Sequence, residues 1–139
     1  MCYIVGMNAN DVFLTVERPV NITVERVKDL LTCAFEGGSN YWVEVAERIG
    51  EAKDRKQAPF LCDAPFVKDG YLKIKEEGSE AKHGKGGWFN IDPKTLAEGL
   101  KVMALKYPKQ FQDFIDENDD AETGDTFLQC VCFGEAIYG

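Results

Sequence analysis

The sequence predicts an α+β domain in which about four helices pack on one face of a small antiparallel sheet. Segments with apolar residues at spacings of three and four lie toward both ends of the chain, and most segments with two-residue alternation lie in its middle. Strands grouped together and helices grouped apart are typical of α+β proteins. The chain has 139 residues, the length of one domain, so we expect residues 1–139 to form a single domain.

The first third predicts a strand, a helix and an ambiguous segment. Residues 11–18 alternate in a half-buried strand pattern, which Pro19 ends. Thr23 is placed as an N-cap for a helix with one apolar stripe, and the glycines at 37–38 end that helix. Residues 41–49 fit a strand, which is our first choice, and also fit helical spacing, so the helix remains an alternative.

The middle of the chain predicts a connection and a hairpin. Residues 50–70 are polar and carry two prolines, which indicates an irregular connection. Residues 71–76 and 87–91 predict two facing strands, because the segment between them is polar and rich in glycine.

The last third predicts three helices. Asp92 is expected to be the N-cap and Pro93 the first residue of one helix, and Pro108 ends it and starts a short second one. The segment 119–139 is apolar on nearly every side, which is typical of a helix in a core or at a subunit interface. A helix this apolar leads us to expect a homodimer.

Negative charge is concentrated near the C-terminus. The net charge of the chain is −8, and residues 109–139 hold eight acids against one lysine. Residues 1–108 are therefore almost neutral, and the sequence predicts one charged C-terminal surface on a neutral scaffold. An acidic chain lacks the clustered cations that direct nucleic-acid binding requires.

This acidic surface is the first candidate site, for a protein partner with a basic surface. Its residues are Asp113, Asp116, Glu117, Asp119, Asp120, Glu122 and Asp125. An alternative is that those at 119–122 stabilise the N-terminus of the last helix. A calcium loop is a poor match, since Ala121 replaces the turn glycine and Phe127 the bidentate glutamate, so no metal is predicted.

Two loops with similar composition form the alternative candidate site. Their sequences, GGSNYW and GGWFN, each place a tryptophan beside asparagine and glycine. If they converge, they form an aromatic, polar pocket for a small, nucleotide-like ligand. The residues of this pocket are Asn40, Tyr41, Trp42, Trp88 and Asn90. The competing interpretation is that the aromatic side chains pack in the core and at the sheet edge.

The remaining reactive residues do not indicate an enzyme. The five cysteines are Cys2, Cys33, Cys62, Cys130 and Cys132, and they are expected to be free thiols. The pair at 130 and 132 lacks a second pair of zinc ligands. The single histidine, His83, lies in a glycine-rich loop and is expected to be solvated. We predict no cofactor and expect binding rather than catalysis.

The chain shows no sign of a membrane or export segment. Its first residues lack a basic region followed by a long apolar run, and no apolar stretch reaches the roughly 18 residues of a membrane span. We therefore expect a cytoplasmic protein with no membrane partner.

Two blocks of the sequence resemble a family of small bacteriophage and prophage proteins without an assigned activity. The blocks are LLTCAFEGGSNYW at 30–42 and the C-terminal run at 107–139. The resemblance implies a phage-encoded accessory protein inside a bacterial host. By analogy with other small acidic phage proteins, it suggests a protein that binds a host or phage protein, such as a counter-defence inhibitor.

Overall fold

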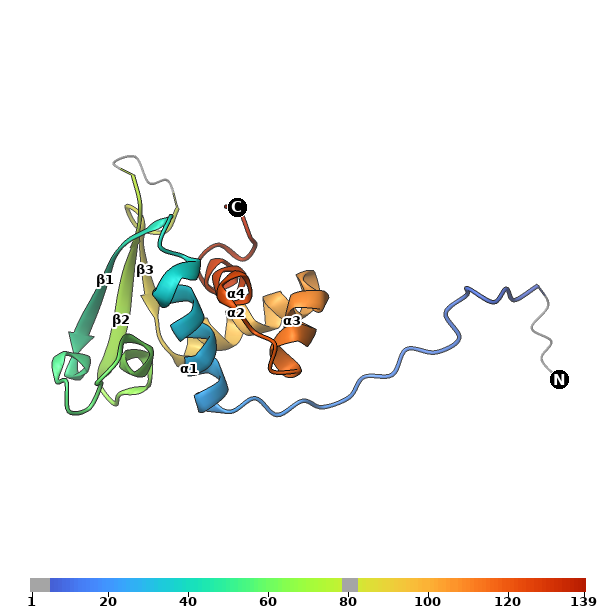
Figure 1. Cartoon of the computed structure of the whole chain (residues 1–139), viewed down its shortest axis with the longest axis horizontal. Coiled ribbons are helices and arrows are strands. Elements are labelled where there is room, and N and C mark those ends of the chain that lie inside the picture. The colour runs from blue at the N-terminus through green and yellow to red at the C-terminus, as the bar shows by residue number, and fades with distance from the viewer. Residues whose placement is uncertain (1–5, 79–82) are drawn as a thin grey trace.

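The computed structural model shows a three-stranded antiparallel sheet with helices on one face, which confirms the predicted fold class (Figure 1). The structure describes residues 6–78 and 83–139, so Cys2 lies outside it. The elements in chain order are α1 (Val24–Cys33), η1 (Ala34–Gly38), β1 (Val43–Gly50), η2 (Glu51–Lys53), η3 (Leu61–Phe66), β2 (Gly70–Glu76), β3 (Trp88–Ile91), α2 (Pro93–Lys106), α3 (Pro108–Ile115) and α4 (Ala121–Phe133).

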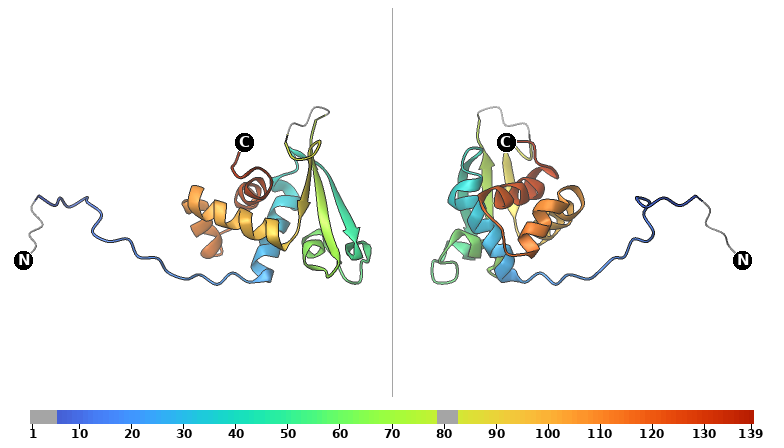
Figure 2. Two further views of the ribbon diagram at one scale, coloured as in Figure 1. Left: turned by 180° about the vertical axis from the view of Figure 1, so that it is seen from behind. Right: turned by 45° about the vertical axis from the view of Figure 1, so that its right-hand side comes forward.

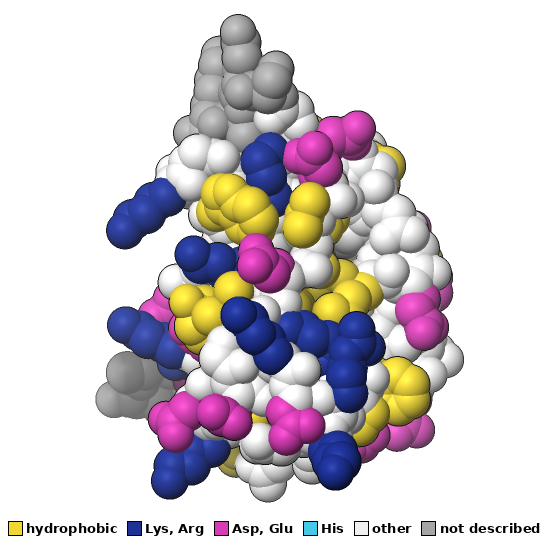
Figure 3. All heavy atoms as spheres, turned by 90° about the vertical axis from the view of Figure 1, so that its left-hand side faces the viewer, with side chains coloured by type: hydrophobic (Ala, Val, Ile, Leu, Met, Phe, Trp, Pro, Cys, Tyr) yellow, Lys and Arg dark blue, Asp and Glu magenta, His cyan; other side chains and the backbone are white. Residues whose placement is uncertain are grey.

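The sheet has one face against the helices and one face in water. Its order is β1-β2-β3, with both neighbouring pairs antiparallel. Leu72, Ile74 and Ile91 are fully buried beneath the helices. Lys73 and Asn90 pair across β2 and β3 in the alternate register and face outward. Figure 3 shows this outer face, where Lys and Arg side chains surround a few apolar ones.

Helix α4 is the centre of the helical layer and packs against the other three helices (Figure 2). Two glycines allow the closest approaches. At Gly124 a Cβ atom would collide with the backbone of α1, and at Gly99 of α2 it would collide with Val131 of α4. The helical layer therefore depends on the absence of a side chain at both positions.

The starts of α1, α2 and α4 follow the predicted capping pattern, whereas α4 ends at Phe133 and not at the end of the predicted segment 119–139. Thr23, Asp92 and Asp120 each accept a hydrogen bond from the backbone N–H three residues later, at 3.3, 2.9 and 3.0 Å. Gly134 ends α4 in the left-handed conformation, with φ of 74°. Side-chain caps satisfy N–H groups that the first turn of a helix leaves without a partner.

The ambiguous segment 41–49 is a strand, as our first choice predicted. Residues 43–50 form β1, which pairs with β2 along its length, apart from a bulge between Val43 and Val45. The bulge reverses the alternation at this point. Val43 packs against the core, whereas Val45 lies on the outer face and is exposed.

The predicted strand at 11–18 was wrong. In the structure this segment has no regular secondary structure and is exposed along its length. It belongs to an extended stretch that leads away from the domain, and we call residues 6–21 the N-terminal arm (Figure 1). A strand is defined by its neighbour, and no strand of the described chain lies beside the arm.

The expectation that the last helix is buried was confirmed. Phe127, Leu128 and Cys130 are almost inaccessible to water. Their neighbours are helices of the same chain, chiefly α1 and α2. The apolar side chains of α4 are thus buried within the domain, so the composition of this helix is no reason to expect a homodimer.

Candidate anion-binding cavity

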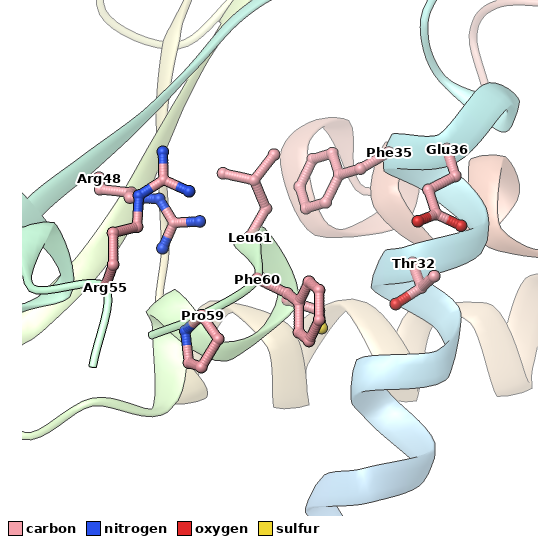
Figure 4. Close-up of a pocket in the computed structure, with 9 residues that line it drawn as sticks. Thr32, Phe35, Glu36, Arg48, Arg55, Pro59, Phe60 and Leu61 are labelled. Atoms are coloured by element: carbon pink, nitrogen blue, oxygen red, sulfur yellow. The ribbon is translucent and has the colours of Figure 1, made fainter. Parts of the chain in front are cut away.

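A cavity lies between β1 and α1. Its volume is about 490 Å³, and the irregular connection after β1 forms its floor (Figure 4). The lining residues are Thr32, Phe35, Glu36, Arg48, Arg55, Pro59, Phe60, Leu61 and Cys62. None of them was predicted as a site residue.

The local folding of the chain brings these walls together. Arg48 pairs with the buried Leu72 across the sheet, so it lies on the face of β1 that turns toward the helices. Gly50 has φ of 63°, which allows the chain to leave β1 in a tight turn and return below it. An ion pair of 2.9 Å between Lys28 and Asp63 ties η3 to α1 and fixes the opposite wall.

Two guanidinium groups meet at one end of the cavity (Figure 4). Burial and the neighbouring charge of Arg55 lower the pKa of Arg48. One Arg48 nitrogen donates a hydrogen bond to the Ala58 carbonyl. Within residues 6–78 and 83–139, no carboxylate lies within ion-pairing distance of either arginine. The two arginines therefore form no direct ion pair within the described residues, and Asp63 acts on Arg48 only at longer range.

The rest of the cavity is apolar and aromatic. Phe35 and Leu61 line its inner part, and Phe60 stands at its mouth with 70% of its surface exposed. Glu36 lies on the α1 side, across the cavity from the arginines (Figure 4). A cavity with cations at one end and aromatic rings along its walls suits an anion with an apolar body.

Three of the seven predicted acidic residues are used inside the molecule. Asp119 forms an ion pair with Arg26 at 2.7 Å, and only 8% of its side chain is exposed. Asp120 caps α4, as the helix-stabilising alternative predicted, and its bond to the Thr123 N–H lowers its pKa. Asp125 is the third, and it is turned toward the loop before β1.

The Asp125 carboxylate holds the GGSNYW loop in place. It accepts hydrogen bonds from the Ser39 hydroxyl at 2.8 Å, the Tyr41 hydroxyl at 2.7 Å and the Trp42 indole N–H at 2.7 Å. Burial and the bond to Asp125 raise the pKa of Tyr41 to about 12. This carboxylate is a structural centre, with three donors already bound to it.

The other four acids stay at the surface around the end of α3 and the start of α4. Asp113 is half-buried and lies 3.8 Å from the ammonium group of Lys109. Asp116, Glu117 and Glu122 are exposed and make no ion pair within the described chain. The available acidic surface is therefore smaller than the sequence predicted.

The two loops of the predicted ligand pocket do not converge. Trp42 is 1% exposed and packs against Phe133 and Tyr138 on the helical side of the sheet. Trp88 lines a shallow hollow with Lys73 on the outer face. Asn90 is exposed on that same outer face, and Asn40 is exposed beside Tyr41. The core-packing interpretation describes Trp42, whereas the other residues are separated by the sheet.

His83 is exposed, as expected, and it also lies beside a buried carboxylate. Its Nδ1 atom is 3.0 Å from the carboxylate of Glu76, which is 2% exposed. The Tyr138 hydroxyl donates to the same carboxylate, and this bond raises the pKa of Tyr138 to about 12. No sequence pattern predicted that β2, His83 and the C-terminal tail meet at this point.

The described cysteines are free thiols. Burial raises the pKa of Cys130 to about 11 and that of Cys132 well above its usual range. Residues two positions apart on a helix point in different directions, so this pair does not form a joint site. Within the described residues no cluster of three metal-ligating side chains occurs.

The sequence signal for the cavity was weak, because its two arginines come from a strand and from an irregular connection.

No helix in the described part of the chain combines the length and apolarity needed to cross a membrane.

No family model, curated protein or solved structure matches the chain.

Proposed function

We propose that the protein binds a small organic anion in the cavity between β1 and α1. The observation that carries this proposal is the pair of guanidinium groups, Arg48 and Arg55, at one end of an apolar cavity. Two like charges held close together repel each other, and at Arg48 partial burial adds to that cost. An anion bound between the two arginines offsets their repulsion.

The chemistry of the walls indicates which anions fit. A guanidinium group is a planar fork that binds carboxylate and phosphate through two parallel hydrogen bonds. Phe35 and Phe60 offer aromatic surface for a ring. A volume of about 490 Å³ lies within the usual range for small-molecule sites. We propose a nucleotide-like ligand, with phosphate at the arginines and the base against the phenylalanines.

Isothermal titration calorimetry tests this proposal with the four ribonucleoside monophosphates, inorganic phosphate and an aromatic carboxylate as probes. We expect at least one organic anion to bind with 1:1 stoichiometry and more tightly than inorganic phosphate. Failure of every probe to bind the wild-type protein would contradict the proposal.

A matched pair of variants then locates the site. Arg55→Gln removes one charge from the cavity, whereas Lys56→Gln removes one charge from the adjacent position, which does not line it. We expect Arg55→Gln to weaken binding at least about tenfold, since a charged hydrogen bond is lost. Equal weakening by Lys56→Gln would show that only general charge matters.

A conservative variant separates geometry from charge. Arg48→Lys keeps the positive charge at position 48 but lacks the planar fork. We expect it to weaken binding of a phosphate or carboxylate while the circular dichroism spectrum stays that of the wild type. Unchanged affinity would mean that Arg48 acts only as a point charge.

A second candidate function uses the exposed acids Asp116, Glu117 and Glu122. They are exposed and without a cationic partner in the described chain, which favours a contact with a basic protein surface. In this role the chain is a phage-encoded accessory protein, as its resemblance to phage proteins implies. A pull-down from bacterial lysate at low and high salt tests it by comparing the wild type with a triple variant, Asp116→Lys, Glu117→Lys and Glu122→Lys. Capture that the triple variant leaves unchanged would exclude this surface.

A further inference from the structure

The N-terminal arm exposes a dense run of apolar side chains. Val12, Phe13, Leu14 and Val16 are 76%, 81%, 69% and 74% exposed. Their alternation is the pattern of a strand, yet no strand of the described chain lies beside them. Apolar side chains grouped in this way on an extended segment are typical of a protein-binding element.

Strand β1 offers a matching edge. It pairs with β2 on one side only, and its other side carries no strand within the described residues. Such an edge leaves backbone N–H and C=O groups ready to pair with a further strand. β1 has eight residues, as many as the arm segment 11–18, whereas the other edge strand, β3, has four.

The surroundings of this edge also complement the arm. Val45, on the outer face of β1, is 41% exposed, and Phe60 at the cavity mouth is 70% exposed. On the arm, Phe13 and Glu17 lie in one alternating row. The cavity beside β1 combines aromatic walls with arginines that have no acidic partner in the described chain. An aromatic ring and a carboxylate in one row match that wall in shape and charge.

The base of the arm points away from the β1 strand of its own chain. Val20 and Ile22 line a hollow with Phe114 and Ile115 of α3. Helix α3 lies on the side of the helical layer far from the sheet, and the arm continues outward from there (Figures 1 and 2). The arm is thus directed away from the sheet of its own chain.

We propose that residues 11–18 of one copy pair with β1 of a second copy, and that the exchange is reciprocal. Each sheet then gains a fourth strand, and the two copies form a symmetric dimer. The Phe13–Glu17 row covers the open side of the neighbour's cavity, and the row of Val12, Leu14 and Val16 continues the outer face beside Val45. Formation of this dimer does not require a ligand in the cavity.

Sedimentation and light scattering of the full chain test the exchange. We expect the wild type to have twice the 15.6 kDa mass of one chain. Leu14→Pro removes a backbone donor from the middle of the arm and should raise the dimer dissociation constant at least about tenfold. Leu105→Ser is the matched control, because Leu105 is 83% exposed on α2 and lies outside the arm; it should leave the dimer intact.

Val45→Lys tests the other side of the contact, since it places a charge beside the proposed added strand. We expect it to weaken the dimer as Leu14→Pro does, with both variants keeping the circular dichroism spectrum of the wild type. A wild-type monomer at every concentration, or a dimer that Leu14→Pro leaves unchanged, overturns the proposal. Leu14→Pro separates the two proposals, because it should weaken the dimer and leave the cavity able to bind its ligand.

Discussion

The charged side chains near α4 and those near β1 differ in how many partners they have within the molecule. Near α4, Asp125 binds three donors, and Asp119 is paired with Arg26. Near β1, Arg48 and Arg55 line a cavity and form no ion pair within the described residues. Residues 109–139 carry most of the net negative charge, yet several of their acids bind other groups of the same domain. The less conspicuous arginines keep their charges available, and this is why the functional proposal rests on them.

The largest expected effect lies where α4 meets α1. Gly124→Val places a side chain against the backbone of Ala34 and Leu30. Overpacking at a helix contact should lower the free energy of unfolding by about 3 kcal/mol, measured by urea denaturation. Ala97→Val adds a similar group at an exposed position of α2 and should cost only about 0.5 kcal/mol. Equal losses would mean that the α1–α4 contact is not the tight region of the molecule.

The next effect concerns the Asp125 centre. Asp125→Ala leaves the Trp42 indole N–H and the Ser39 hydroxyl without their acceptor. Unsatisfied buried donors are costly, so we expect a loss of about 2 kcal/mol in the free energy of unfolding. Asp116→Ala, at the exposed end of α3, should change it by less than about 0.5 kcal/mol. If both variants cost the same, the acids near α4 do not differ in role as their contacts indicate.

A smaller, pH-dependent effect is expected at the N-cap of α4. Asp120→Ala should cost about 1 kcal/mol at neutral pH. Its hydrogen bond to the Thr123 N–H lowers the pKa of Asp120 below 3.8 in the folded state. A lowered pKa means that the charged cap stabilises the fold above about pH 3.8 and that this stability is lost as the pH falls through the folded-state value. The difference between wild type and Asp120→Ala should therefore shrink in acid, as urea denaturation at pH 7 and below pH 3 would show.

Asp120→Asn provides the control for charge. Asparagine also caps helices but does not titrate in this range, so its contribution should be the same at both pH values. A pH-dependent difference between Asp120→Asn and Asp120→Ala would point to another titrating group.

The smallest effect on stability is expected at the cavity. Arg55→Gln removes a like charge from beside Arg48, so in the absence of ligand the free energy of unfolding should stay within about 0.5 kcal/mol or rise slightly. A destabilised variant would show that Arg55 supports the fold, and this would weaken the contrast between the two regions.

Local signals in the sequence were sufficient for most of the secondary structure. Thr23 and Asp92 mark helix starts because their side chains act on backbone groups only three residues away. The failure at 11–18 has a different cause, since alternation shows what a segment is able to pair with and not whether a partner is present. At Val45 the bulge overturns the alternation, and a one-residue irregularity leaves little trace in the sequence.

The candidate site was harder to predict than the fold. Arg48 and Arg55 come together only because the chain turns at Gly50 and the irregular connection returns beneath β1. An arginine on the inner side of a strand is an unusual residue for that position, and it was the available signal. The inward position of Arg48 could be recognised only in the structure, because the bulge between Val43 and Val45 decides which side of β1 faces the helices.

The place of α4 in the fold has a consequence for the order in which the domain assembles. Leu30 and Leu31 of α1 are fully buried, and α4, which packs against α1, lies some ninety positions further along the chain. Contacts between such distant segments close slowly, because a long loop has to be ordered first. During synthesis, α1 emerges from the ribosome well before α4. Its apolar stripe therefore remains uncovered for most of translation, and we expect the domain to acquire its core only after α4 has emerged.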